Sequence, residues 1–311
     1  MAFQGAAASW VIQLINEELP GYFKSTYLDE NTADGQINNK AIHSRKRSNI
    51  DRIKTIVALL LLLCVFLPLP AMAAEKEQRE MKIGIIGAMK PEVDTLQENM
   101  QVTRRETKAG MEFCEGNIGT MKAVVVQSGM GKVHAAICAQ ILVDDFAVTH
   151  IINTGVAGSL NRKLDIGDIV VSVDAVQHDF TVEAIGFKKG EIPYTGQVAF
   201  AADEELRQKA VQGVKKVLPQ VSAVEGRICS GDQFISSQDA KDRIVSAFHG
   251  DCAEMEGAAI AQVCYVNKIP FVILRAISDK ADDSSPISFE EFAKQAAKNS
   301  ASLVQFMLEH W

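Results

Sequence analysis

The sequence predicts an α/β protein: a single three-layer α/β/α domain built on a mostly parallel or mixed central sheet. From residue 81 onward, short apolar runs typical of buried strands alternate with longer segments of helical periodicity. This alternation is the pattern of strands joined by helices that cover both faces of one sheet. Glycine-rich or acidic turns follow several runs, and such sheets bind ligands outside the carboxyl ends of their strands. We therefore expect one domain over residues 81–311, with its site at that edge.

Strands are expected where apolar residues cluster between glycines and polar turns. Gly119-Thr120 separates two such runs and predicts a hairpin. The stretch from Gly186 to Gly196 is rich in glycine and has no periodicity, so it is expected to be a loop. The expected strands cover residues 82–88, 111–118, 121–127, 151–158, 168–176, 227–230 and 271–276.

Helices are expected in the segments between these runs. Pro91 is compatible with a first helical turn, and Ser237 is a candidate N-cap for the helix that follows it. The expected helices cover residues 91–100, 133–143, 202–218, 238–248, 257–267 and 288–309.

Composition excludes several classes of function. The chain has 311 residues, of which 47% are hydrophobic, and a formal net charge of −7. This acidic balance, with only 6% aromatic residues and no basic stripe, argues against nucleic acid as a partner. None of the six cysteines is in CxxC spacing, and there is no HExxH or EF-hand sequence, so no metal motif is visible.

The N-terminal region differs from the rest. A basic cluster at residues 45–54 precedes the apolar run Ile56–Leu67 and then Ala71-Met72-Ala73. This order is typical of a secretory signal peptide over residues 55–73, cleaved after Ala73, and it predicts export to the periplasm or outside the cell. Residues 1–54 are expected to be a poorly structured extension, or the result of a wrongly assigned start. The alternatives are a membrane anchor over residues 56–74, which would be the only membrane contact, or a cytoplasmic protein.

Four stretches are candidates for chemistry. Glu254 and Glu256 stand two residues apart, so in an extended segment both carboxylates would face one pocket; alternatively, both sit at a helix N-terminus, where negative charge is favourable. Arg275–Asp279 and Gly84–Val93 each end an apolar strand. Ser128–Lys132 could present backbone N–H groups to a polar ligand, or could be only a tight turn.

Six segments together carry a family resemblance. They are MKIGIIGAMKPEV, QSGMGKV, INTGVAG, SGDQFI, AEMEGAAIAQVC and RAISDKAD, in that order. With them, residues 81–309 resemble the 5′-methylthioadenosine/S-adenosylhomocysteine nucleosidases of the purine nucleoside phosphorylase superfamily. The resemblance implies a nucleoside phosphorylase-like fold and hydrolysis of the N-ribosidic bond to adenine and a 5-substituted ribose, with 5′-deoxyadenosine as a further candidate substrate. It also implies no metal or organic cofactor and a homodimer, in which the loop near Gln177–Phe187 borders the partner's pocket.

The resemblance also implies catalytic roles. Cleavage leaves an adenine anion and a cationic ribosyl group, so the leaving group must be protonated. Asp279 matches the general acid that protonates N7, and Ser278 orients it. Glu92 matches the residue that positions and activates water, with help from Arg275.

Other positions match substrate-binding residues. Glu256 matches the carboxylate that holds the ribose hydroxyls, with Met255 beside the sugar and Glu254 close by. Phe234 matches the ring that stacks on the purine, and Ile235 the residue whose backbone meets the adenine edge. Ser128 and Phe289 match further pocket positions.

Three alternatives stay open at this point. After His178-Asp179 the chain has Phe180–Ile185 where the family often has another aspartate and more aromatic residues, so a futalosine-type hydrolase with a different 5′ group is possible. A nucleoside phosphorylase would need cationic phosphate ligands where this chain has Glu92. An exported purine-nucleoside binding protein would need no general acid and base.

Overall fold

A computed structural model describes residues 80–311 of the chain. The expected extension over residues 1–54 and the predicted signal peptide over residues 55–73 lie outside the described residues. Within residues 80–311, no helix combines the length and the apolar character needed to cross a bilayer.

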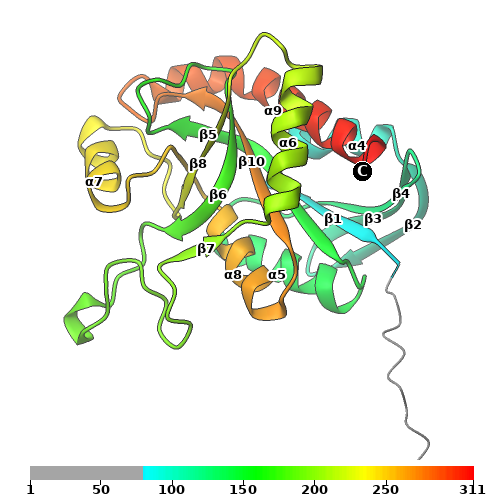
Figure 1. Cartoon of the computed structure of the whole chain (residues 1–311), viewed down its shortest axis with the longest axis horizontal. Helices are drawn as coiled ribbons and strands as arrows, with labels where there is room; N and C mark the ends of the chain where they lie inside the picture. Colours follow the sequence, from blue (N-terminus) through cyan, green and yellow to red (C-terminus); the bar gives the residue numbers. More distant parts are fainter. Residues whose placement is uncertain (1–79) are drawn as a thin grey trace, which may run out of the picture. The chain divides into compact units, whose positions relative to one another are not determined.

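The centre of the domain is one mixed sheet (Figure 1). Its order is β10-β6-β8-β9-β5-β1-β4-β3-β2, with β7 paired to β6. Because β5 also pairs with β10, the strands β5, β10, β6, β8 and β9 close into a ring, and the other strands extend from it. The strands are β1 Lys82–Gly87, β2 Gln101–Lys108, β3 Met111–Ile118, β4 Met121–Gln127, β5 His150–Ser159, β6 Ile169–Gln177, β7 Ala199–Ala201, β8 Ala223–Ser230, β9 Cys252–Glu254 and β10 Phe271–Asp279.

Helices cover both faces of the sheet, as the sequence predicts. On one face, α5 (Lys132–Asp144) and α8 (Gly257–Asn267) contribute to an apolar cluster that includes Phe113 and Phe200. On the other face, α4 (Lys90–Glu98), α6 (Glu204–Val217) and α9 (Ser285–Glu309) form a second cluster (Figure 1). A smaller cluster packs α7 (Gln238–Phe248) against β8 and β9. A three-layer α/β/α architecture results, and the fold prediction is confirmed.

Most elements match their predicted ranges, and the differences have physical causes. The hairpin strands β3 and β4 and the helices α7 and α8 have the predicted bounds, and the Ser237 hydroxyl accepts the Ala240 N–H as an N-cap. The edge strand β2 was not predicted, because its sequence QVTRRETK is polar and no residue in it is buried. The strands β7 and β9 have three residues each, too few to show a pattern.

Strand direction brings the candidate stretches together. β1 runs parallel to β5, and β5 runs parallel to β10, so their carboxyl ends meet at one edge. β9 ends beside β8, to which it is also parallel. Residues that are almost 190 positions apart in the chain, such as Glu92 and Asp279, therefore face a common space.

Candidate active site

A cavity opens at the carboxyl ends of β1, β5, β9 and β10. It holds about 570 Å³ of empty space, part of which is open to solvent. Its lining combines acidic side chains with methionine and phenylalanine, the mixture expected of a site for a partly apolar ligand with polar groups. The lining residues are Ala88, Met89, Glu92, Met130, Val156, Ala157, Gly158, Gln233, Phe234, Ile235, Ala253, Glu254, Met255, Glu256, Ser278, Asp279 and Phe289.

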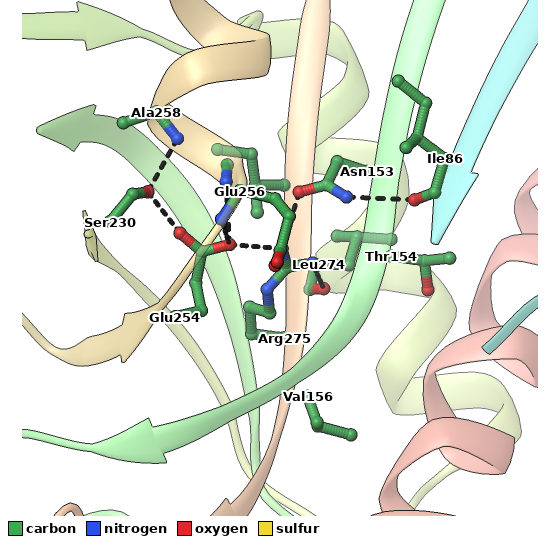
Figure 2. A network of polar contacts seen from close by, with 12 residues as sticks. Ile86, Asn153, Thr154, Val156, Ser230, Glu254, Glu256, Ala258, Leu274 and Arg275 are labelled. Carbon is green, nitrogen blue, oxygen red and sulfur yellow. Dashed lines mark hydrogen bonds and ion pairs between the residues drawn. The ribbon is translucent and has the colours of Figure 1, made fainter. Parts of the chain in front are cut away.

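A buried arginine, Arg275, contacts two of the acidic side chains that line this cavity, Glu254 and Glu256 (Figure 2). Arg275 on β10 is 1% exposed, and its Nη2 donates to Asn153 Oδ1 at 2.7 Å and forms an ion pair with Glu254. Glu256 Oε2 lies 3.7 Å from the same nitrogen. Burial acts to lower the pKa of Arg275, but the neighbouring carboxylates outweigh it and raise the pKa, so the guanidinium stays charged.

Glu254 joins Arg275 to the start of α8. Its carboxylate accepts the hydroxyl of Ser230 and the backbone N–H groups of Glu256, at 3.1 Å, and Gly257, at 2.8 Å (Figure 2). Both interpretations of the Glu254–Glu256 spacing are therefore partly correct. Glu254 sits at a helix N-terminus and satisfies its free N–H groups, and both side chains also line the cavity.

Glu256 presents its carboxylate to the cavity from the N-cap position of α8. Its Oε1 accepts the backbone N–H of Gly131 at 2.8 Å, which ties it to the turn before α5. Burial and the nearby charge of Glu254 raise the pKa of Glu256 to about 7, although Arg275 opposes the change. Near neutral pH this group is therefore balanced between its acid and its carboxylate.

Glu92 enters the cavity from the first turn of α4. Its Oε2 accepts the Met89 N–H at 2.9 Å, and its Oε1 accepts the Val156 N–H at 3.2 Å. Burial raises the pKa of Glu92, while Arg275 and the backbone donors limit the rise. Gly155 has no side chain at the point of contact: a Cβ there would lie 2.9 Å from Glu92 Oε1 and 3.0 Å from Arg275 Nη1. This glycine is needed for the carboxylate and the guanidinium to approach each other.

Asp279 ends β10, lines the cavity and is 2% exposed. Ser278 Oγ donates to its Oδ2 at 2.9 Å, and the Ala281 N–H donates to its Oδ1 at 2.8 Å. A Cβ on Gly158 would lie 2.7 Å from Oδ1, so this position also leaves space for the carboxyl group. Both oxygens are thus held in a single orientation.

An aromatic pair forms the more open part of the cavity. The rings of Phe234 and Phe289 meet edge to face, with centroids 5.5 Å apart, and Phe234 is 47% exposed. Ile235, by contrast, is buried. A flat aromatic ligand could stack on this pair.

The charge balance of the site favours a cationic ligand or intermediate. Three buried carboxyl groups, those of Glu92, Glu254 and Glu256, surround the one guanidinium of Arg275. Electrostatic interactions are strong in such a buried environment, so developing positive charge would be stabilised there.

Comparison with known proteins places the chain in a family. Residues 82–309 match the model of the phosphorylase superfamily. The 5′-methylthioadenosine/S-adenosylhomocysteine nucleosidase of Tolumonas auensis is 42% identical over 230 residues, which cover 74% of this chain and 99% of that protein. This chain belongs to that nucleosidase family.

Solved structures of nucleosidases agree. The enzyme of Colwellia psychrerythraea, solved in complex with adenine, has a TM-score of 0.71 and 41% identity, over 74% of this chain and 95% of its own. The futalosine hydrolase of Helicobacter pylori has a TM-score of 0.70 and 34% identity, over 74% of this chain and 98% of its own.

Most of the residues that the nucleosidase resemblance indicated lie together. All of them line the cavity except two. Arg275 lies behind the lining and contacts it through Glu254 and Glu256. Ser128 is not among the lining residues, and its hydroxyl donates to the Gly129 carbonyl at 2.9 Å.

Several residues of the nucleosidase site were not predicted from the sequence. Asn153 orients Arg275 and also donates to the Ile86 carbonyl at 2.9 Å, joining β5 to β1 (Figure 2). Ser230 bonds Glu254 and accepts the Ala258 N–H at 2.7 Å. A polar side chain inside or at the end of an apolar strand was the available signal, because such a group needs a buried partner. Met89, Met130, Val156 and Gln233 in the cavity lining carried no comparable signal.

Proposed function

We propose that this protein hydrolyses the N-ribosidic bond of 5′-methylthioadenosine and S-adenosylhomocysteine, and also of 5′-deoxyadenosine, to adenine and a 5-substituted ribose. The observation that carries the proposal is the convergence of Asp279, Glu92 and Glu256 on one cavity from three separate parts of the chain. Binding a nucleoside would not require an acid and two further carboxylates in one cavity. This argues against a protein that only binds purine nucleosides.

Asp279 acts as the general acid in this proposal. It lies at the end of β10 beside the aromatic pair, where it can give its proton to N7 of a stacked adenine. As the proton leaves, the Ser278 hydroxyl and the Ala281 N–H stabilise the carboxylate that forms. Departure of neutral adenine is easier than departure of its anion, which is the reason for general acid catalysis.

Glu92 and Glu256 act on the sugar side. With its raised pKa, Glu92 is suited to take a proton from the attacking water near neutral pH. The guanidinium of Arg275 stays charged and interacts favourably with the negative charge of the Glu92 carboxylate. Glu256 accepts hydrogen bonds from the ribose hydroxyls, and these strengthen as the ribosyl cation forms. Phe234 stacks on the purine, and Met255 lies beside the sugar.

A futalosine-type hydrolase is the second candidate. The favouring observation is the similarity to the Helicobacter pylori futalosine hydrolase, together with the unusual loop Phe180–Ile185. Both activities use the same acid and base, so the substrates distinguish them: futalosine differs from methylthioadenosine in its 5′ group and carries hypoxanthine in place of adenine.

An assay on a panel of 5′-substituted nucleosides tests these functions. We expect adenine release from methylthioadenosine without phosphate. Faster release of hypoxanthine from futalosine would favour the second candidate, and activity only with added phosphate would identify a phosphorylase. Binding without turnover would refute the proposal.

We also propose a homodimer. Large apolar side chains are exposed on α5 and α8, which pack against each other: Val133 and Ile137 on α5 are 68% and 42% exposed, and Tyr265 and Val266 on α8 are 45% and 58% exposed. Exposed apolar patches of this kind mark protein interfaces. The adjacent Met130 is 62% exposed and lines the cavity, so a second copy placed here would also border the site. Light scattering that gives the mass of one chain, with full activity, would contradict this.

Export is proposed from the sequence at residues 55–73. The thiols in the described part of the chain are compatible with it, because Cys114, Cys138, Cys229, Cys252 and Cys264 are all buried. Burial raises the pKa of the Cys138 and Cys264 thiols, which keeps them in the unreactive protonated form.

A further inference from the structure

We propose that Lys241, which lies outside the cavity on α7, is a positioning residue for the Asp279 carboxyl group. It acts through a single peptide unit, that between Lys280 and Ala281. The inference rests on the proposed function, in which Asp279 is the general acid.

The environment of Lys241 is unusual for a lysine. The residue is 6% exposed, and its Nζ donates to the Lys280 carbonyl oxygen at 2.6 Å. Lysine is seldom buried without a partner, because removing the ammonium from water is costly. Burial lowers the pKa of Lys241, while the charge of Asp282 opposes this. A methionine or leucine at this position would pack at lower cost, so the ammonium needs another explanation.

The acceptor of this bond belongs to the peptide unit that holds Asp279. The Lys280 carbonyl and the Ala281 N–H are the two ends of one peptide group, and that N–H donates to Asp279 Oδ1 at 2.8 Å. In a trans peptide the two groups point in opposite directions. Lys241 therefore fixes the orientation of the planar Lys280–Ala281 peptide group through its carbonyl oxygen, while the N–H of the same group donates to Asp279. The positive charge of Lys241 also polarises this peptide group and makes the Ala281 N–H a stronger donor.

The backbone turn at Lys280 and Ala281 has a strained conformation, so contacts that hold it in place matter. Ala281 has a φ of +51°, in the left-handed region where a Cβ lies too close to the following carbonyl oxygen. Ala281 is also fully buried, so the turn cannot relax toward solvent. On its other side, the Lys280 side chain bonds the Leu164 carbonyl and lies 3.2 Å from Asp165 Oδ1. Lysine contacts thus hold this peptide from two neighbouring parts of the fold.

The experiment compares two leaving groups. Adenine needs a proton to depart, whereas p-nitrophenolate does not, so a p-nitrophenyl 5-methylthioriboside bypasses the general acid. We expect Lys241→Met to lower kcat for methylthioadenosine by roughly 10- to 100-fold, as for a misplaced catalytic group. KM and hydrolysis of the p-nitrophenyl substrate should change little. Lys241→Arg, which keeps the donor, should restore most of the lost rate.

Matched controls separate the role of Lys241 from the assignment of Asp279 as the general acid. Lys216→Met removes an exposed lysine on α6 and should leave both substrates unaffected. Asp279→Asn should show the same selectivity for the leaving group as Lys241→Met, but more strongly. If Asp279→Asn is selective and Lys241→Met slows both substrates equally, or neither, the role of Lys241 is refuted. If Asp279→Asn itself is not selective, the general acid assignment fails, and the Lys241 proposal fails with it.

Discussion

Replacing Glu256 with glutamine should make the folded protein more stable at alkaline pH while it reduces activity. Glutamine has the shape of the protonated acid, and its amide oxygen can still accept the Gly131 N–H. The substitution removes a negative charge that is buried beside Glu254. The native Glu256 is therefore expected to lower the stability of the folded protein in exchange for ribose binding, a common property of active-site groups.

The size of the effect follows from the pKa. In the unfolded chain the group titrates near its ordinary pKa of 4.5, and in the folded protein at about 7. The folded state therefore binds more protons between these values, and the free energy of unfolding falls as the pH rises from 4.5 through 7. At 1.36 kcal/mol per pH unit, the loss by pH 8 is on the order of 3 kcal/mol. Part of this belongs to the interaction with Glu254, so 3 kcal/mol is an upper estimate.

Urea denaturation at pH 5 and pH 8 measures this difference. The wild-type protein and Glu256→Gln should have similar stability at pH 5, and the variant should be more stable by about 1–3 kcal/mol at pH 8. Glu205→Gln, on the exposed face of α6, is the matched control and should follow the wild type at both values. Protein concentration is held constant, because a dimer would make the midpoint depend on it.

Two results would refute the reasoning. One is a Glu256→Gln variant that is no more stable than the wild type at pH 8, since the buried charge would then cost nothing. The other is full activity in this variant, because the carboxylate is proposed to hold the ribose hydroxyls in the transition state.

The other predictions concern the general acid Asp279, the base Glu92, the contact of Gly155 with Glu92 and Arg275, and the N-terminus. Asp279→Asn should reduce kcat by roughly 10²–10⁴-fold with adenine binding largely retained, measured by steady-state adenine release and by calorimetry; near wild-type turnover would exclude Asp279 as the acid. Glu92→Gln should lose turnover to a similar degree, because an amide cannot take a proton from water, and an unchanged rate would contradict this. Gly155→Ala should lower both stability and kcat, because its Cβ would meet Glu92 Oε1 at 2.9 Å; wild-type thermal unfolding would argue against the tight contact. Intact-mass measurement of protein from its own host should find a chain that starts at Ala74, and retention of residues 56–67 would rule out cleavage.

Much of the fold was determined by the sequence alone. The apolar runs and helical segments after residue 81 alternate so regularly that the layers and most element bounds followed from them, since hydrophobic periodicity reflects which face is buried. Local signals also held: Gly119-Thr120 joins β3 to β4, and Ser237 caps α7. The order of the six motifs was sufficient to indicate the family and most of the cavity.

Only the tertiary structure decided how the polar groups pair. That Arg275 bonds Asn153 and Glu254 depends on the register of β10 against β5 and on the position of β9, which no local pattern records. The closure of five strands into a ring and the polar edge strand β2 likewise depend on contacts between distant segments. Local sequence sets which side chains are buried, but a hydrogen bond between strands is set by their relative placement, and a network such as that of Arg275 is visible only once the strands are assembled.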